Sequence, residues 1–325
     1  MKSVQLFWSA AAILSVYCSR ADAERIFWTD IAGPAGSHFI RTAGPGPGLE
    51  TIVTGLRDPR GMAVDVLNGK MYWTEPGLGS IRRANLDGTG AEPVIATSNA
   101  ASGVALDLAS GKMYWTDGVP GSGKIRRANL NGSDAEDIVP SGPLHPVGIS
   151  LDLVHQKVYW TDLEGNFDGN GKIQRSNLDG SNIETIVSGI DEANGLAVDP
   201  VGGKLYWPDL TGNRIQRANL DGSGVEDIVV GVNDPITVGL DLISGKVYWT
   251  DSMSGSAAPI TNRIDQANLN GSGRETIVSG VGSPWGIAII PVPEPSTILL
   301  TGLGLFYAVG VPTGLKKERA YSIAS

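Results

Sequence analysis

Hydrophobic positions between residues 24 and 290 occur in short runs, separated by turns rich in Gly, Asn, Asp and Ser. Runs of this kind, rich in β-branched and aromatic residues, predict strands. In the best-defined stretch, four strands are expected in succession, at 103–107, 112–116, 124–130 and 136–139. No helical period of 3.6 residues competes with this pattern. The chain is therefore predicted to be all-β and built from four-stranded antiparallel units.

The unit recurs around one tetrapeptide, an aromatic residue followed by Trp, then Thr or Pro, then an acidic residue. Its six tryptophans are Trp28, Trp73, Trp115, Trp160, Trp207 and Trp249, which lie 45, 42, 45, 47 and 42 residues apart. Its acidic residues are Asp30, Glu75, Asp117, Asp162, Asp209 and Asp251. A period of this length, filled with strands, is typical of a β-propeller blade. Because the carboxylates recur at one phase of the repeat, we expect them to be structural rather than catalytic.

The two ends of the repeat region complement each other. Residues 25–28 correspond to a second strand with no first strand before it, and residues 284–290 to a first strand with no second strand after it. Pairing these segments would complete a blade and remove the open edges of a linear array. The sequence therefore predicts a closed propeller of six blades over residues 24–290.

The tetrapeptide resembles the YWTD motif of the class B repeats of the low-density lipoprotein receptor family, and the resemblance covers roughly residues 24 to 290. It implies a six-bladed propeller of the YWTD or TolB-like type, with the aromatic pair between the sheets and the aspartates hydrogen-bonded within and between blades. Pro208 replaces the motif Thr, Thr237 replaces a first-strand Gly, and Gly44 replaces an Asn. We expect blades 1 and 5 to be the weakest. The receptors' cysteine-rich modules do not occur in this sequence, so their ligands are not implied.

Loop lengths separate the two faces of the predicted propeller. The turns between the first and second strands, and between the third and fourth, keep constant lengths. By contrast, the spacing from the tetrapeptide's acidic residue to the third-strand Ile is 10, 6, 8, 11, 6 and 13. Insertions confined to one face usually mark the binding face. On that face, the residues just before the first-strand cores should surround the central channel: Arg60, Ser102, Val147, Asn194, Ile236 and Trp285.

This ring favours a binding site over a metal centre. Trp285 supplies an aromatic platform, and Arg60, Ser102 and Asn194 supply hydrogen-bonding groups for a peptide or sugar. Equally, Trp285 could simply plug the channel. A metal-dependent lactonase or lyase would need converging acidic and amide ligands, and the ring contains no carboxylate. A structural matrix protein is a further alternative, in which the variable face has no ligand.

One loop has a calcium-like pattern. Oxygen ligands occur at every second residue, at Asp162, Glu164, Asn166, Asp168 and Asn170. The twelfth position counted from Asn166 is Asn177, however, where an EF-hand requires a bidentate Glu. A solvated glycine-rich loop explains the same residues, so calcium is the weaker interpretation.

The flanking segments predict export. Residues 1–23 have the pattern of a secretory signal peptide, and cleavage after Ala23 would remove Cys18, the single cysteine. Residues 291–297 contain Pro293, Glu294 and Pro295, followed by an apolar run at 298–315 long enough for a transmembrane helix and a basic tail at 316–325 that is expected to be cytoplasmic. This order resembles the PEP-type C-terminal sorting signal of Gram-negative bacteria, which implies processing by an exosortase-type protease. A plain single-pass anchor is the alternative.

Charge adds little beyond this. The formal net charge is −9, which disfavours nucleic acid and anionic membranes as partners. The three histidines, at His38, His145 and His155, fall at different phases of the repeat and form no recognisable catalytic or metal-binding spacing. The sequence thus predicts an exported, non-catalytic binding module at the cell envelope or in the extracellular matrix, with no cofactor and with a protein or polysaccharide ligand.

Overall fold

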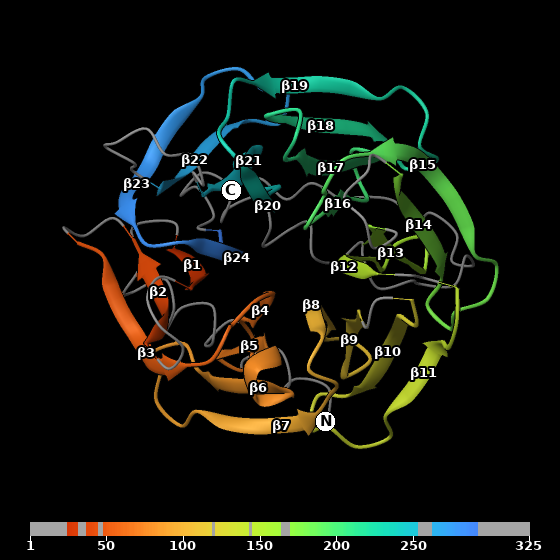
Figure 1. Ribbon diagram of the computed structural model, residues 1–325. Helices are drawn as coiled ribbons and strands as arrows, with labels where there is room; N and C mark the ends of the chain where they lie inside the picture. Colours follow the sequence, from red (N-terminus) through yellow and green to blue (C-terminus); the bar gives the residue numbers. More distant parts are fainter. Residues whose placement is uncertain are drawn as a thin grey trace, which may run out of the picture. The chain divides into compact units, whose positions relative to one another are not determined.

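The computed structural model describes residues 25–31, 37–44, 48–118, 121–142, 145–163, 170–252 and 262–291. Within these residues the chain forms six separate four-stranded antiparallel sheets, the blades of a propeller. The sheets are arranged around a central axis, with β4, β8, β12, β16, β20 and β24 nearest that axis (Figure 1). The all-β, six-bladed prediction is therefore confirmed.

Each blade is named by its place in the ring, and its strands are given from the axis outward. Blade 1 contains β24 (Pro284–Ile290), β1 (Arg25–Asp30), β2 (His38–Ala43) and β3 (Glu50–Leu56). Blade 2 contains β4 (Met62–Asp65), β5 (Lys70–Glu75), β6 (Ser80–Asn85) and β7 (Glu92–Ala96), with the 3-10 helix η1 (Pro76–Leu78) between β5 and β6. Blade 3 contains β8 (Ala101–Asp107), β9 (Lys112–Asp117), β10 (Lys124–Asn129) and β11 (Glu136–Val139).

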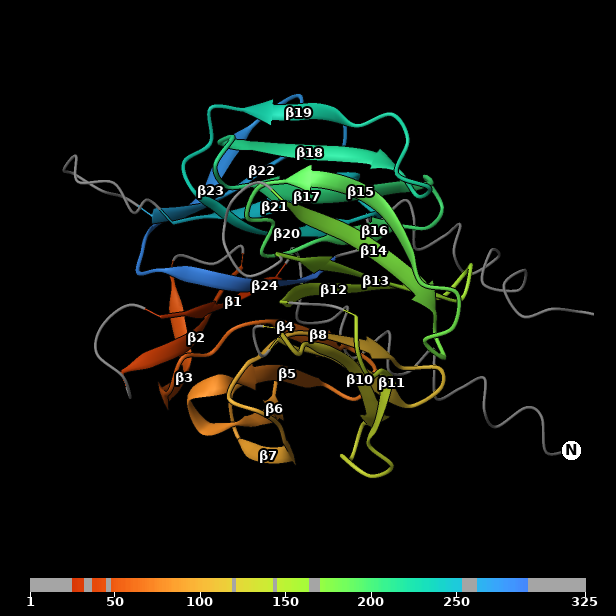
Figure 2. The ribbon, with the colours of Figure 1, turned by 45° about the vertical axis from the view of Figure 1, so that its right-hand side comes forward.

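The remaining blades follow the same order. Blade 4 contains β12 (Pro146–Asp152), β13 (Lys157–Asp162), β14 (Gly171–Asn177) and β15 (Glu184–Ile190). Blade 5 contains β16 (Ala197–Asp199), β17 (Lys204–Asp209), β18 (Arg214–Asn219) and β19 (Glu226–Val230). Blade 6 contains β20 (Pro235–Asp241), β21 (Lys246–Asp251), β22 (Asn262–Asn268) and β23 (Glu275–Val281). Figure 2 shows the inner strands β4, β8, β12 and β24 gathered at the middle and the outer strands β7 and β19 at the periphery.

The ring closes as the two end segments predict. Strand β24 pairs antiparallel with β1, and Arg25 lies opposite Ile290. A second link runs through the motif aspartate, because Asp30 accepts hydrogen bonds from the backbone N–H groups of Gly282 and Ser283 at 3.0 and 2.8 Å. Strands from both ends of the repeat region thus share one blade, which closes the ring.

The core lies between the sheets. All six motif tryptophans are fully buried, and so are the aromatic residues that precede them. In each blade the second strand, which carries the motif, is buried on both faces because a neighbouring blade covers each side. The tetrapeptide therefore recurs because each blade needs the same large side chains to fill the wedge between adjacent sheets.

An arginine on the third strand joins neighbouring blades at their outer edges. In blade 3, Arg127 donates to the Glu136 carboxylate at 2.7 Å and to the Leu178 carbonyl of blade 4 at 2.9 Å. Arg83, Arg175 and Arg217 make the same pair of contacts in their blades. The carboxylates in these pairs belong to the glutamates that open the fourth strands, Glu92, Glu136, Glu184 and Glu226. They orient the arginines that link one blade to the next.

Candidate functional site

The inner strands approach one another at a ring of glycines around the channel. The ring consists of Gly61, Gly103, Gly148, Gly195 and Gly286, with Thr237 in the sixth place. A Cβ atom on Gly61 would lie 2.5 Å from the Ser102 carbonyl oxygen, and one on Gly103 would lie 2.6 Å from that of Val147. Since real Cβ atoms do not approach so closely, these positions require glycine for the contact between blades.

The motif threonine holds this ring together. In blade 3, the Thr116 hydroxyl accepts from the Gly103 N–H at 2.8 Å and donates to the Val147 carbonyl of blade 4 at 2.7 Å. Thr29 makes the equivalent bonds to Gly286 and Arg60 at 2.8 and 2.7 Å. In these two blades the buried hydroxyl therefore joins its own inner strand to that of the next blade, which explains a threonine at this place in the motif.

Two irregularities of the ring accompany departures of the sequence from the motif. In blade 6, which has Thr237 in place of glycine, the corresponding bonds of Thr250 lengthen to 3.2 and 3.3 Å. In blade 5 the motif residue is Pro208, which has neither a hydroxyl nor an amide N–H, and β16 shortens to the three residues Ala197–Asp199.

The motif carboxylates are hydrogen-bonded and ion-paired to other groups of the propeller. Asp209 accepts from the Gly212 N–H and from Arg214, both at 2.7 Å. Asp162 accepts from the His145 N–H at 2.7 Å and lies 3.9 Å from the Lys172 ammonium. The other motif carboxylates likewise accept a hydrogen bond from a loop and form an ion pair with an arginine of the third strand. These carboxylates are Asp30, Glu75, Asp117 and Asp251. Their positions fit the structural role expected from the sequence.

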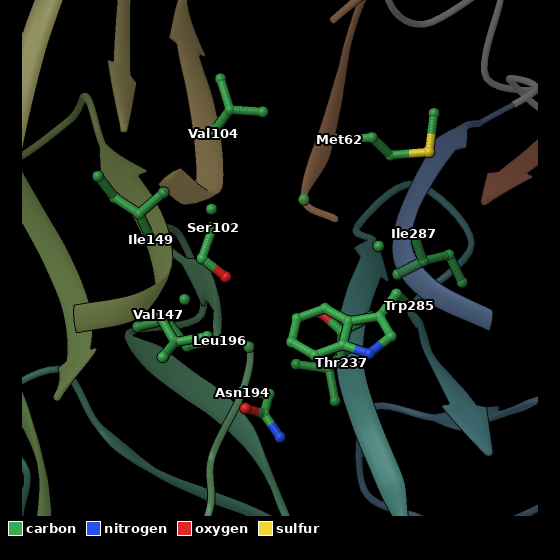
Figure 3. A pocket seen from close by; sticks show the side chains of 16 residues that line it. Met62, Ser102, Val104, Val147, Ile149, Asn194, Leu196, Thr237, Trp285 and Ile287 are labelled. Carbon is green, nitrogen blue, oxygen red and sulfur yellow. The ribbon is translucent and has the colours of Figure 1, made fainter. Parts of the chain in front are cut away.

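Within the ring lies a narrow cavity of about 80 Å³. Ser102, Val147, Asn194 and Trp285 are among its lining residues, so three of the four candidate binding residues meet at the channel. Figure 3 shows the Trp285 indole projecting into the cavity, with Asn194 and Thr237 nearby. Ser102 and Val147 are buried, whereas Asn194 and Trp285 are partly exposed. The accessible part of the site is therefore its mouth.

Arg60 does not line the cavity but completes the mouth. Its guanidinium carbon lies 4.4 Å from the centre of the Trp285 ring, a cation–π contact. The Asp58 carboxylate holds it there, accepting hydrogen bonds from Arg60 Nε and Nη2 at 3.2 and 3.1 Å. Asp58 in turn donates its backbone N–H to His38 Nδ1 at 2.9 Å. Arg60 and Trp285 thus form one pre-oriented platform at the rim of the channel.

Charge is distributed unevenly around this face. On the segments before β16 and β20, burial raises the pKa of Glu192, and the neighbouring carboxylates Asp191 and Asp234 raise it further. Near Asp162, burial lowers the pKa of His145. The segments that lead into β16 and β20 therefore carry a group of interacting carboxyl groups, separate from the cationic Arg60.

Sequence reasoning missed Asp58, which positions Arg60, and the arginines that join the blades. The repeated Arg before the third-strand Asn was a visible signal for the arginines, and nothing in the sequence singled out Asp58.

The calcium prediction lies largely outside the described residues, because these exclude Glu164, Asn166 and Asp168. Asn170 is described and exposed. Among the residues that the structure describes, no three His, Cys, Asp or Glu side chains are grouped so that they could hold a metal ion. The described part of the chain also contains no helix long and apolar enough to cross a membrane. The predicted helix at 298–315 and the Pro293–Glu294–Pro295 motif fall beyond it.

Comparison with known proteins gives the repeat type. Residues 111–152 and 156–200 match the family described as low-density lipoprotein receptor repeat class B. Over 65 residues the chain is 48% identical to nidogen-2 of Mus musculus, an overlap of 20% of this chain and 4% of nidogen-2. The chain thus spans only a small fraction of the length of this relative.

Solved structures agree on the fold. A chain from a crystal structure of a nidogen–laminin complex superposes with a TM-score of 0.69 at 23% identity, covering 83% of this chain and 100% of that one. TolB from Acinetobacter baumannii superposes with a TM-score of 0.67 at 13% identity, covering 82% and 67%. Such identities establish the fold alone. On the repeats and the fold together, the chain carries class B repeats of the low-density lipoprotein receptor type, and they build a six-bladed β-propeller.

Proposed function

We propose that the protein is a non-catalytic binding module whose ligand docks over the channel mouth on the variable face. The supporting observation is a contrast between backbone and side chain. The residues before the ring glycines repeat one backbone contact, since the carbonyls of Arg60, Ser102, Val147 and Trp285 all accept from a motif threonine. Their side chains nevertheless all differ. Of these side chains, those of Arg60 and Trp285 are partly exposed at the mouth, and they are therefore available for recognition.

The ligand class that fits best is an extracellular protein. Partly exposed Trp and Arg side chains, fixed in place before binding, are the residues that most often dominate protein interfaces. One structurally similar chain comes from a complex of nidogen with laminin, which is a fact about that complex and an analogy here. A polysaccharide is the second candidate, because the partly exposed indole of Trp285 offers an apolar platform against which a sugar ring can pack.

The same proposal includes export. The signal-peptide pattern at 1–23 and the sorting-signal pattern at 291–325 would deliver the propeller to the outside, held transiently by the helix at 298–315 and processed at Pro293–Glu294–Pro295 by an exosortase-type protease. Mass spectrometry of the C-terminus of the protein recovered from its source cells tests this point. A chain ending near Pro295 is expected, and an intact Ser325 in all material would argue for a plain anchor.

The binding proposal is tested by comparing variants of the full chain as bait. Arg60→Ala and Trp285→Ala remove the platform, and Val225→Ser, an exposed position in the turn between β18 and β19 on the opposite face, is the matched control. With the envelope and extracellular proteins of the source cells as prey, we expect wild type and control to retain a common protein that the platform variants bind at least about tenfold more weakly. Retention of glycans instead would favour the polysaccharide. Ligand binding unaffected by either platform variant would refute the proposed site.

A further inference from the structure

The face opposite the variable loops carries a collar of apolar side chains. In the five hairpins that join first and second strands, both residues after the first-strand Asp are apolar. These pairs are Val66 and Leu67, Leu108 and Ala109, Leu153 and Val154, Pro200 and Val201, and Leu242 and Ile243. Hairpin tips normally favour Gly, Asn, Asp and Ser. Here Val201 is 90% exposed, Val154 66% and Leu67 65%.

Hydrogen bonds within each turn hold these hairpin tips in place. At the end of β16 the buried Asp199 carboxylate accepts from the backbone N–H groups of Val201 and Gly202 at 3.1 and 2.7 Å. Asp241 accepts in the same way from Ile243 and Ser244, at 2.8 and 3.1 Å. Asp65, Asp107 and Asp152 close the other three turns. These hydrogen bonds hold the collar in place. Its most exposed apolar side chains are therefore presented to solvent instead of being buried in the core.

The path of the chain indicates what the collar faces. All inner strands run toward the same face, so β24 ends at Ile290 at the place where the other five blades form their apolar tips. The sequence there continues with Pro291 and Val292, which repeat the Pro–Val pair of blade 5. Only the six residues 292–297 separate Pro291 from the apolar run at 298–315, so the distance from Pro291 to the start of that run is at most about 25 Å.

We propose that the collar is a lipid-docking surface, on which the propeller sits against the bilayer interface while the apolar run anchors the chain. This inference is independent of the ligand at the channel mouth, but it has a consequence for it. The variable face would point away from the membrane, toward partners in the surrounding medium.

The charged residues around the collar indicate that apolar contacts, and not ionic ones, would hold it on the lipid. A lysine opens each second strand behind the tips, at Lys70, Lys112, Lys157, Lys204 and Lys246. Four of them donate to third-strand asparagines. Farther out, the turns between third and fourth strands carry exposed carboxylates, including Asp87, Asp179 and Asp221. Because these opposite charges offset each other, docking should occur on zwitterionic lipid and persist at high salt.

The test places a fluorophore on the collar. Cys18 is the single cysteine, so a Cys18→Ser background allows unique labelling at Val201→Cys with a polarity-sensitive dye. The matched control is Leu78→Cys, an exposed apolar position (46%) in η1 on the variable face. The full chain is reconstituted into phosphatidylcholine vesicles containing acyl-chain nitroxide lipid. We expect quenching of more than about half of the collar signal and little of the control signal.

Further variants separate docking from tethering. Val154→Ser and Ile243→Ser, in the blades flanking Val201, should together reduce the quenching while the chain remains on the vesicles. Equal quenching at both labels, or none at Val201, would overturn the proposal. So would a failure of the chain to associate with the vesicles. A shift of the Val201 dye to shorter wavelength without nitroxide quenching would instead identify a second copy or another protein as the occupant, and would also overturn it.

Discussion

The tight turn between the third and fourth strands offers a direct test of how the blades are held together. Gly222 has a φ of +84°, and a Cβ atom there would lie 2.6 Å from the Ile186 carbonyl carbon of blade 4 and still closer to its oxygen. Gly203, in the same blade, has a φ of +67° with nothing within 4 Å of its added Cβ. Replacing each by alanine therefore imposes a similar left-handed backbone cost, but only Gly222→Ala also forces two blades apart.

The magnitudes follow from these two terms. A left-handed backbone costs a non-glycine residue about 1–2 kcal/mol. Forced displacement in a packed region adds about 1–3 kcal/mol. We therefore expect Gly203→Ala to destabilise the fold by about 1–2 kcal/mol and Gly222→Ala by about 2–5 kcal/mol. At about 2–4 °C per kcal/mol, the second variant should melt up to about 10 °C below the first.

Thermal unfolding followed by circular dichroism and by tryptophan fluorescence provides the measurement. The two probes should agree, because the motif tryptophans lie between the sheets. Equal losses for the two variants would show that close approach between blades adds nothing beyond backbone strain, and would refute the reasoning.

Three further variants test the ring and its electrostatics by urea unfolding. Thr116→Val leaves the Gly103 N–H and the Val147 carbonyl without their buried partner, so it should cost about 2–4 kcal/mol, and a loss below about 0.5 kcal/mol would argue against the bridging role. Pro208→Thr should restore that bridge in blade 5 and stabilise by about 1 kcal/mol after the loss of proline's rigidity, whereas destabilisation would mean that the shortened β16 has adapted to the proline. Glu192→Gln tests a raised pKa, since a carboxylate that ionises less readily when folded loses stability as the pH rises above its unfolded value near 4.5. The variant should match wild type below that pH and exceed it toward pH 7, and a constant difference across this range would contradict the assignment.

The candidate site shows where sequence reasoning reaches its limit. Spacing placed the residues before the first strands at one mouth of the channel, because every blade repeats the same topology. It could not say that Ser102 and Val147 would be buried while Trp285 and Asn194 remain accessible, or that Asp58 would hold Arg60 against the indole. Those outcomes depend on side chains contributed by other blades.

The fold could be predicted from the sequence because the patterns that specify it are local and repeated. Blade number, ring closure and the division into constant and variable faces follow from strand-length apolar runs, Asx–Gly turns and the period of the tetrapeptide, each encoded within about one blade. Only the tertiary structure revealed why particular residues are required. Thr116 bridges to a carbonyl 31 residues away, and Gly222 accommodates a strand of the preceding blade. Contacts of this kind arise when separate blades are brought within a few ångströms of each other, and a pattern along one chain does not specify such distances.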